Sequence, residues 1–206
     1  MEDLTPDSLS KEKSLWEIFK KTLEIKESFL NLFLLIVVFI VISIYTIFFD
    51  KGLTESGFIL RSLADTGAGF STSILGFLIA GFTIFTSIAD KSLFVSMAKE
   101  RKDGYTFSWL KFVFFVFMKV FIHYFVFTCL CYFVKIFFTE NGIISSFLGR
   151  ASEGLLVKGI FLKTTLVVIG TYLVYLLILL KSFLFNIYEV SMMAIRWQFE
   201  VEEGSV

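Results

Sequence analysis

The residues of this sequence that could do chemistry form a stripe in which small and hydroxylated side chains lie between two carboxylates. Successive members are three or four residues apart, so on a helix they share one face. The stripe consists of Asp65, Gly69, Ser73, Gly76, Ala80, Thr83, Ser87 and Asp90. Such a face has two interpretations, and the sequence leaves both open.

The first interpretation is close helix packing within an oligomer. Small residues let helix backbones approach, and the resulting dispersion contacts hold helices together where water supplies no hydrophobic force. Asp65 would then cap the start of the helix, and Asp90 would mark its solvated end. In the second interpretation, several copies turn the stripe toward a common axis, where it lines a narrow cation path with rings of aspartates at its mouths.

A second group consists of ionisable residues inside an apolar, strongly aromatic segment. Lys119 and His123 are four residues apart and therefore share a helix face. Ionisable groups at that depth usually face a bundle interior or water and are candidates for function. The structural alternative is that Lys119 extends its ammonium toward the headgroups. A neutral His123 would then bond to a hydroxyl or to a backbone carbonyl.

Enzymatic chemistry is not expected from these residue types. The two cysteines, Cys129 and Cys131, point to different faces of a helix, and His123 is the one histidine of the chain. Zinc sites and histidine-based triads are therefore not expected, and the sequence contains no phosphate-binding loop. We expect no metal, no cofactor and no direct contact with nucleic acid.

Long apolar segments position these residues. Hydrophobic residues make up 56% of the 206-residue chain and charged residues 18%, whereas a soluble domain has about 25% charged residues. About 20 helical residues cross a hydrocarbon core roughly 30 Å thick. Four segments are that long: Phe29–Phe49, Gly67–Ala89, Phe112–Phe138 and Gly159–Leu180. The sequence thus predicts an all-α integral membrane protein with four transmembrane helices.

The ends of the chain are more polar than its middle. Ser14 followed by Glu17 is a capping-box pattern, and the alternation after it predicts an amphipathic N-terminal helix at the membrane interface. The basic segment between the second and third spans predicts a short surface helix. We expect a cytoplasmic N-terminal segment at 1–28, a transmembrane domain at 29–188 and a cytoplasmic tail at 189–206.

The distribution of Lys and Arg predicts the orientation, because basic residues near the spans stay on the cytoplasmic side. Five lie before the first span, five between the second and third, and two after the fourth. The opposite side holds five, two of them in an expected loop that contains Lys51, Glu55, Arg61 and Asp65. Twelve basic residues against five predict that both termini lie in the cytoplasm.

The segment ILGFLIAGFTIFTSIADKSLFVSMA (74–98), set in a four-span chain of this length and orientation, resembles KwaA, the membrane component of the Kiwa antiphage system. The resemblance implies a homo-oligomeric sensor of phage infection in the bacterial inner membrane. It also implies a cytosolic DNA-binding partner, KwaB. The basic cluster of Lys99, Arg101 and Lys102 would be a docking surface for that partner, although topology alone also places basic residues there.

A competing hypothesis treats the chain as a small oligomeric cation channel or a membrane-permeability effector. The second span would then line the pore. Ion flux measured in liposomes would favour this hypothesis. A neighbouring gene for a soluble DNA-binding protein would favour the sensor.

Overall fold

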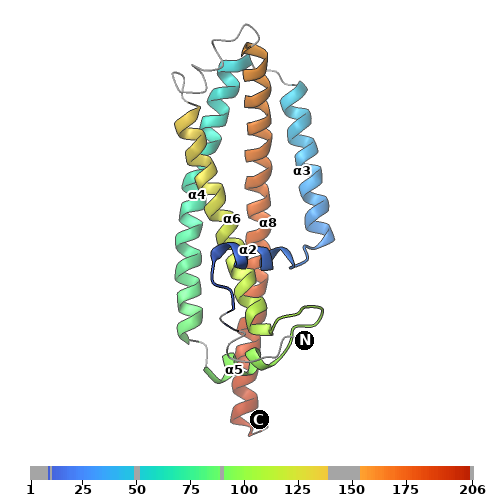
Figure 1. Cartoon of the computed structure of the whole chain (residues 1–206), viewed down its shortest axis with the longest axis vertical. Helices are drawn as coiled ribbons and strands as arrows, with labels where there is room; N and C mark the ends of the chain where they lie inside the picture. The colour runs from blue at the N-terminus through green and yellow to red at the C-terminus, as the bar shows by residue number, and fades with distance from the viewer. Residues whose placement is uncertain (1–8, 10, 49–51, 89–90, 139–153, 205–206) are drawn as a thin grey trace. The chain divides into compact units, whose positions relative to one another are not determined.

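The described part of the chain is all-helical. The computed structural model describes residues 9, 11–48, 52–88, 91–138 and 154–204, which form six helices (Figure 1). They are α2 (Leu15–Leu23), α3 (Phe29–Phe48), α4 (Gly52–Ile88), α5 (Lys91–Lys99), α6 (Trp109–Phe137) and α8 (Gly154–Glu202). Four of them, α3, α4, α6 and α8, are long and apolar enough to cross a membrane. The prediction of an all-α chain with four candidate spans is confirmed.

The start of α4 differs from the prediction. A loop was expected up to Asp65, but α4 begins at Gly52 and includes Glu55, Arg61 and Asp65 within its 37 residues. Asp65 therefore lies inside the helix and does not cap it. The charged residues lower the local hydropathy, but no proline interrupts the segment, so the helix continues through them.

The end of α8 also differs from the prediction. The helix runs for 49 residues to Glu202, whereas a separate tail was expected from residue 189. Glutamate and arginine are good helix formers in water, and Arg196 pairs with Glu200 one turn later at 3.1 Å. The polar end of the chain therefore continues the fourth span.

The packing divides the described chain into two compact units. One unit consists of residues 27–76 and 123–178, and the other of residues 1–26, 77–122 and 179–206. Each contains part of α4, α6 and α8. We call them the α3 unit and the α2 unit, after the helix that each contains whole.

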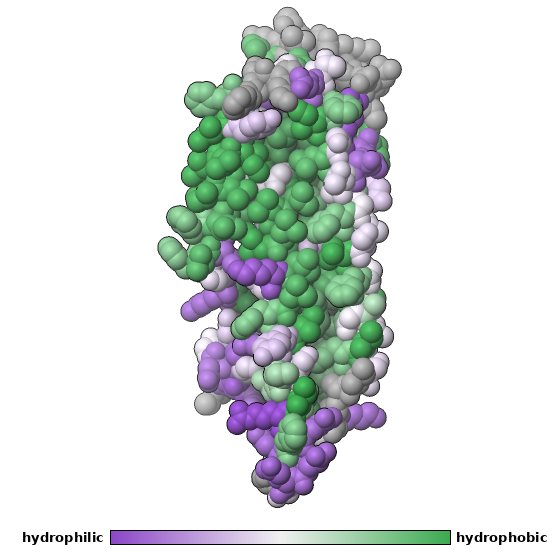
Figure 2. Space-filling model, turned by 180° about the vertical axis from the view of Figure 1, so that it is seen from behind, coloured by the Kyte–Doolittle hydropathy of each residue, from purple (hydrophilic) through white to green (hydrophobic). Residues whose placement is uncertain are grey.

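In the α3 unit, small residues let helices approach. A Cβ at Gly67 of α4 would lie 3.1 Å from the Phe127 ring of α6 and 3.2 Å from the Cys131 sulfur. On α8, a Cβ at Gly170 would lie 3.3 Å from Ile42 of α3. Figure 2 shows apolar residues (green) gathered over a broad surface, as expected for helices that face lipid.

In the α2 unit, aromatic rings form most of the core. Phe82 of α4 lies 5.5 Å from Phe114 and 5.3 Å from Phe117 of α6, centroid to centroid. Phe117 also meets Phe183 of α8 edge to face at 4.9 Å. Such pairs add roughly 0.5–1.5 kcal/mol each beyond the area that they bury. The phenylalanine-rich third span is therefore explained in this unit by packing.

The N-terminal helix begins as the sequence predicts. The Ser14 hydroxyl accepts a hydrogen bond from the Glu17 N–H at 3.2 Å, while the Glu17 carboxylate accepts one from the N–H of Lys13 at 2.8 Å. The reciprocal bond of the capping box thus goes one residue before the cap. The predicted surface helix is α5, whose Leu93 and Met97 are buried.

Candidate functional site

The small-residue stripe lies on an outward face of α4. Its members Asp65, Gly69, Ser73, Gly76, Ala80, Thr83 and Ser87 are all exposed, whereas Asp90 lies outside the described residues. A Cβ built at Gly69 or at Gly76 meets no atom within 4 Å. The stripe therefore makes no close helix contact within the described chain.

The hydroxyls of the stripe are bonded to their own helix. Ser73 donates to the Gly69 carbonyl at 2.9 Å, Thr83 to the Ile79 carbonyl at 2.9 Å, and Ser87 to the Thr83 carbonyl at 2.8 Å. Each hydroxyl proton is thus already used, and the oxygen remains available to accept a bond. This arrangement lets a polar side chain face an apolar medium at low cost.

Asp65 has a partner that the sequence did not indicate. Its carboxylate forms an ion pair with the ammonium of Lys135 on α6, and both side chains are partly exposed. The pair neutralises the carboxylate that was expected to attract cations at one mouth of a channel. The 70 residues that separate Lys135 from Asp65 explain why no spacing pattern revealed the pair.

The contact between α4 and α6 uses a different face of α4. Leu60, Ala64, Ala68 and Ser71 are buried there together with Gly67. The Thr128 hydroxyl of α6 lies 2.8 Å from the Ser71 hydroxyl, and Ser71 donates to the Gly67 carbonyl at 2.7 Å. Small residues recur at helical spacing on this face too, so small-residue spacing alone does not distinguish the two faces of α4.

Lys119 is covered by protein in the described chain. The residue is 8% exposed, and its ammonium donates to the Ile25 carbonyl at 3.3 Å. Ile25 follows the C-cap of α2, Glu24, where the helix dipole presents its negative end. Lys119 therefore holds the end of the N-terminal helix against α6.

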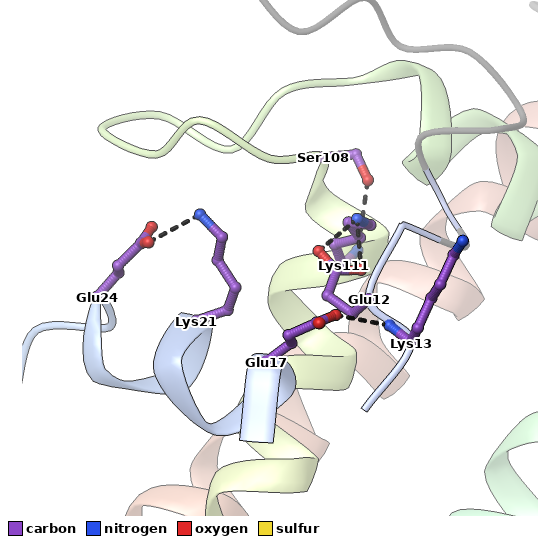
Figure 3. Close-up of polar contacts among 7 residues, drawn as sticks. All are labelled: Glu12, Lys13, Glu17, Lys21, Glu24, Ser108 and Lys111. Atoms are coloured by element: carbon purple, nitrogen blue, oxygen red, sulfur yellow. Dashed lines mark hydrogen bonds and ion pairs between the residues drawn. The ribbon is translucent and has the colours of Figure 1, made fainter. Parts of the chain in front are cut away.

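The other end of the N-terminal segment is held by an ion pair. The Lys111 ammonium lies 2.8 Å from both carboxylate oxygens of Glu12 (Figure 3), and both side chains are 13% exposed. Between the two ends, Ile18 and Ile25 pack against Phe115 and its neighbours on α6. By contrast, the Lys21–Glu24 pair on α2 is more exposed, at 39% and 45%.

His123 lies in the α3 unit among tyrosines of α8. Its Nδ1 atom is 3.1 Å from the Tyr172 hydroxyl, which also lies 3.3 Å from the His123 carbonyl oxygen and can donate to it. The Tyr175 ring meets the imidazole edge to face at 5.1 Å. A neutral imidazole satisfies this geometry, and the tyrosine hydroxyl is one of the two kinds of partner expected for it.

The three residues of the basic cluster in the α5–α6 connection differ in exposure. Lys99 and Arg101 are exposed, whereas Lys102 is half-buried, with its ammonium 3.4 Å from the centroid of the Trp109 ring. Burial lowers the pKa of Lys102, and the carboxylates of Glu189 and Asp103 partly oppose this shift. Lys102 thus packs against the fold, and Lys99 and Arg101 present their charge to the surroundings.

The connection itself is a tight turn. Trp109 donates its N–H to the Glu100 carbonyl at 2.9 Å, and Tyr105 donates to the Lys102 carbonyl at 3.1 Å. Gly104 has a φ of +79°, which is favourable at the third position of a type II turn because glycine has no Cβ. This turn fixes where Arg101 emerges.

Metal ligands do not gather in the described ranges, where no group of three or more His, Cys, Asp or Glu side chains could hold an ion. Cys129 is exposed and Cys131 buried, and both are free thiols. Comparison with protein-family models, with curated proteins and with solved structures found no match to this chain.

Proposed function

We propose that this chain is a KwaA-like sensor component of a bacterial antiphage system, acting in the inner membrane as a homo-oligomer with a cytosolic DNA-binding partner. The observation that carries the proposal is the exposed face of α4, with open space above Gly69 and Gly76. Glycine within a helix costs about 0.5–1 kcal/mol relative to alanine. A face of this kind is favourable where another helix backbone approaches it.

The second element of the proposal is a docking surface on the side where both termini lie. Lys99 and Arg101 are exposed beside the turn that joins α5 to α6. A soluble partner with an acidic patch would complement this charge, and electrostatic complementarity mainly sets specificity and the rate of association. The Lys102 ammonium, over the Trp109 ring, would support the shape of this surface.

A cation channel is the second candidate, because the exposed face also carries the hydroxyls of Ser73, Thr83 and Ser87. One observation favours the sensor, because the Asp65 carboxylate is paired with the Lys135 ammonium. A cation-selective mouth needs carboxylates whose field acts on the ion, and an adjacent ammonium cancels most of that field.

The test of assembly is Gly76→Leu, with Gly81→Leu as its matched control. Both glycines are in α4 with no atom within 4 Å of an added Cβ, but Gly81 is outside the stripe. If the stripe contacts a second copy, Gly76→Leu overpacks the contact at a cost of about 1–3 kcal/mol. The oligomer in nanodiscs, counted by native mass spectrometry, should dissociate in that variant alone. An intact oligomer in both variants contradicts the assignment of this face.

The test of the sensor role is recovery of the soluble protein encoded beside this gene. Lys99→Glu with Arg101→Glu should abolish its co-purification with the full-length membrane protein and should abolish phage resistance. Lys21→Glu is the control, because that lysine is also exposed and charged but lies on α2. Cation flux in liposomes with unchanged partner recovery would instead support the channel.

A further inference from the structure

An open cavity of about 250 Å³ lies between α3 and α8 in the α3 unit. Phe39, Ser43 and Thr46 line it from α3, and Lys163, Thr164 and Val167 line it from α8. The surface of the cavity is mostly apolar, with the hydroxyl residues Ser43, Thr46 and Thr164 and one lysine among its lining. The cavity is distinct from the exposed stripe of α4 and from the surroundings of His123.

Most residues of helix α3 are exposed, and Thr46 is its one buried residue. One close contact with α8 lies where a Cβ at Gly170 would be 3.3 Å from Ile42. Lipid surrounding a membrane helix of this kind therefore has direct access to the cavity.

The hydroxyls in the cavity are not suited to holding water. Ser43 donates to the Phe39 carbonyl at 2.7 Å, and Thr46 donates to the Ile42 carbonyl at 2.7 Å. A buried water typically makes about three hydrogen bonds to polar groups that lack other partners. The protons of Ser43 and Thr46 are thus used within α3, and the mostly apolar surface of the cavity favours an apolar occupant.

Lys163 lies at the level where the apolar length of α3 ends. The contact of Ile42 with Gly170 sets the register of these antiparallel helices. Measured along α8 from this contact, Lys163 lies seven residues before Gly170, which is about 10 Å. Measured along α3 from the same contact, the helix ends at Phe48, six residues after Ile42, which is about 9 Å. Side chains of a helix tilt toward its N-terminus, so the ammonium points to the headgroup region.

We propose that this cavity binds one phospholipid, whose acyl chain lies against Phe39 and Val167 and whose phosphate pairs with the Lys163 ammonium. The apolar walls match a hydrocarbon chain, and the cation at the headgroup level matches a phosphate. The lipid fills the space between α3 and α8. With both termini in the cytoplasm, the lipid belongs to the outer leaflet of the inner membrane.

The location of the lipid can be tested without any substitution. The full-length protein is placed in nanodiscs of phosphatidylethanolamine and phosphatidylglycerol that contain a phospholipid with a diazirine on its acyl chain. After irradiation, cross-links should concentrate on the segment from Phe39 to Ile47 and on the facing part of α8. Cross-links spread evenly over all outward faces of α3 would overturn the proposal.

The role of Lys163 is tested with Lys163→Gln, and Lys158→Gln is the matched control on the same helix outside the cavity. Native mass spectrometry after detergent extraction should find one retained phospholipid in the unchanged protein and in the control. Loss of a charged contact should lower retention about tenfold in Lys163→Gln. Equal retention in all three proteins, or equal loss in both variants, would overturn the assignment of the phosphate to Lys163.

Two further experiments test which ligand occupies the cavity. Ser43→Phe fills the cavity and should remove the cross-links even though Lys163 is unchanged. Excess inorganic phosphate should leave lipid retention unchanged, because it lacks the chain that occupies the apolar walls. If inorganic phosphate displaces the lipid, the site recognises a phosphate ion alone and the proposal is wrong. The ratio of the two lipids retained shows whether a net negative headgroup is preferred.

Discussion

At the scale of single residues, two glycines of α4 that lie two positions apart have opposite surroundings. A Cβ at Gly67 would lie 3.1 Å from the Phe127 ring, whereas a Cβ at Gly69 meets nothing within 4 Å. Two residues are about half a turn on a helix, so they face opposite sides. One glycine serves the packing of α4 on α6, and the other lies on the face that we assign to a second copy.

Gly67→Leu should therefore destabilise the monomer, whereas Gly69→Leu should not. The larger side chain at Gly67 has to displace the Phe127 ring, and overpacking of this kind costs about 1–3 kcal/mol. Unfolding in sodium dodecyl sulfate, followed by circular dichroism on protein dissociated to monomers, measures this difference. Equal destabilisation by the two substitutions would contradict the arrangement of α4 on α6.

His123 and Tyr172 should be coupled, since the Nδ1 atom lies 3.1 Å from the hydroxyl. A double-mutant cycle with His123→Phe and Tyr172→Phe should give a coupling free energy of about 0.6 kcal/mol, and at most about 1.7 kcal/mol, as for other hydrogen bonds between membrane helices. The cycle cancels the separate bond from Tyr172 to the His123 carbonyl. Tyr132→Phe, at an exposed position of α6, is the control and should show no coupling with His123→Phe.

At the scale of elements, α2 is attached to α6 at both ends. Glu12 pairs with Lys111 before the helix, and Lys119 donates to the Ile25 carbonyl after it. On the outward side of α2, Leu15, Trp16 and Leu23 are each about 60% exposed, and Glu17 and Lys20 are exposed as well. A helix that mixes exposed apolar and charged side chains is typical of a position at the bilayer interface.

Lys119→Met keeps the apolar stem and removes the ammonium, so it should loosen α2 while leaving the fold intact. A hydrogen bond from a charged group contributes about 1.5–3 kcal/mol, which corresponds to at least about tenfold faster amide exchange if local opening of α2 limits it. Hydrogen–deuterium exchange of the α2 amides in nanodiscs measures the effect. Lys21→Met is the control, because the Lys21–Glu24 pair is exposed and contributes little. Unchanged exchange in Lys119→Met would mean that the apolar contacts alone hold α2.

The sequence predicted these elements better than it predicted their contacts. The long apolar runs identified all four candidate spans, because the bilayer fixes how many apolar residues a helix needs. The sequence predicted the polar first and last turns of the helices less well, since Glu55 and Arg61 are as compatible with a helix as with a loop. The packing face of α4 could not be chosen from the sequence, because Gly67 and Gly69 both belong to small-residue series and only the position of Phe127 separates them.

At the scale of the whole molecule, the lengths of the helices limit how much of each can lie in a bilayer. Helix α8 has 49 residues and is roughly 73 Å long, more than twice the thickness of the hydrocarbon core. Its uncharged stretch is residues 164–180, and its charged residues Lys181, Glu189, Arg196, Glu200 and Glu202 belong to the α2 unit. The length of α8 therefore exceeds what a bilayer core can cover, and its charged end belongs to the same unit as Lys99 and Arg101.

The orientation of the molecule gives the last prediction. Alkaline phosphatase folds only where disulfides form, outside the cytoplasm, so a fusion reports the side on which its junction lies. Fusions after Glu55 and after Ser146 should be active, whereas fusions after Arg101 and at the C-terminus should be inactive. The twelve-to-five asymmetry of basic residues predicts this pattern, since moving Lys99 and Arg101 across the membrane is unfavourable. The junction after Glu55 lies four residues into α4, so α3 is the one complete span before it. The reverse pattern would place Lys99 and Arg101 outside the cell and Lys163 in the inner leaflet. It would contradict the cytosolic partner while leaving the phospholipid site intact, so the two proposals can fail separately.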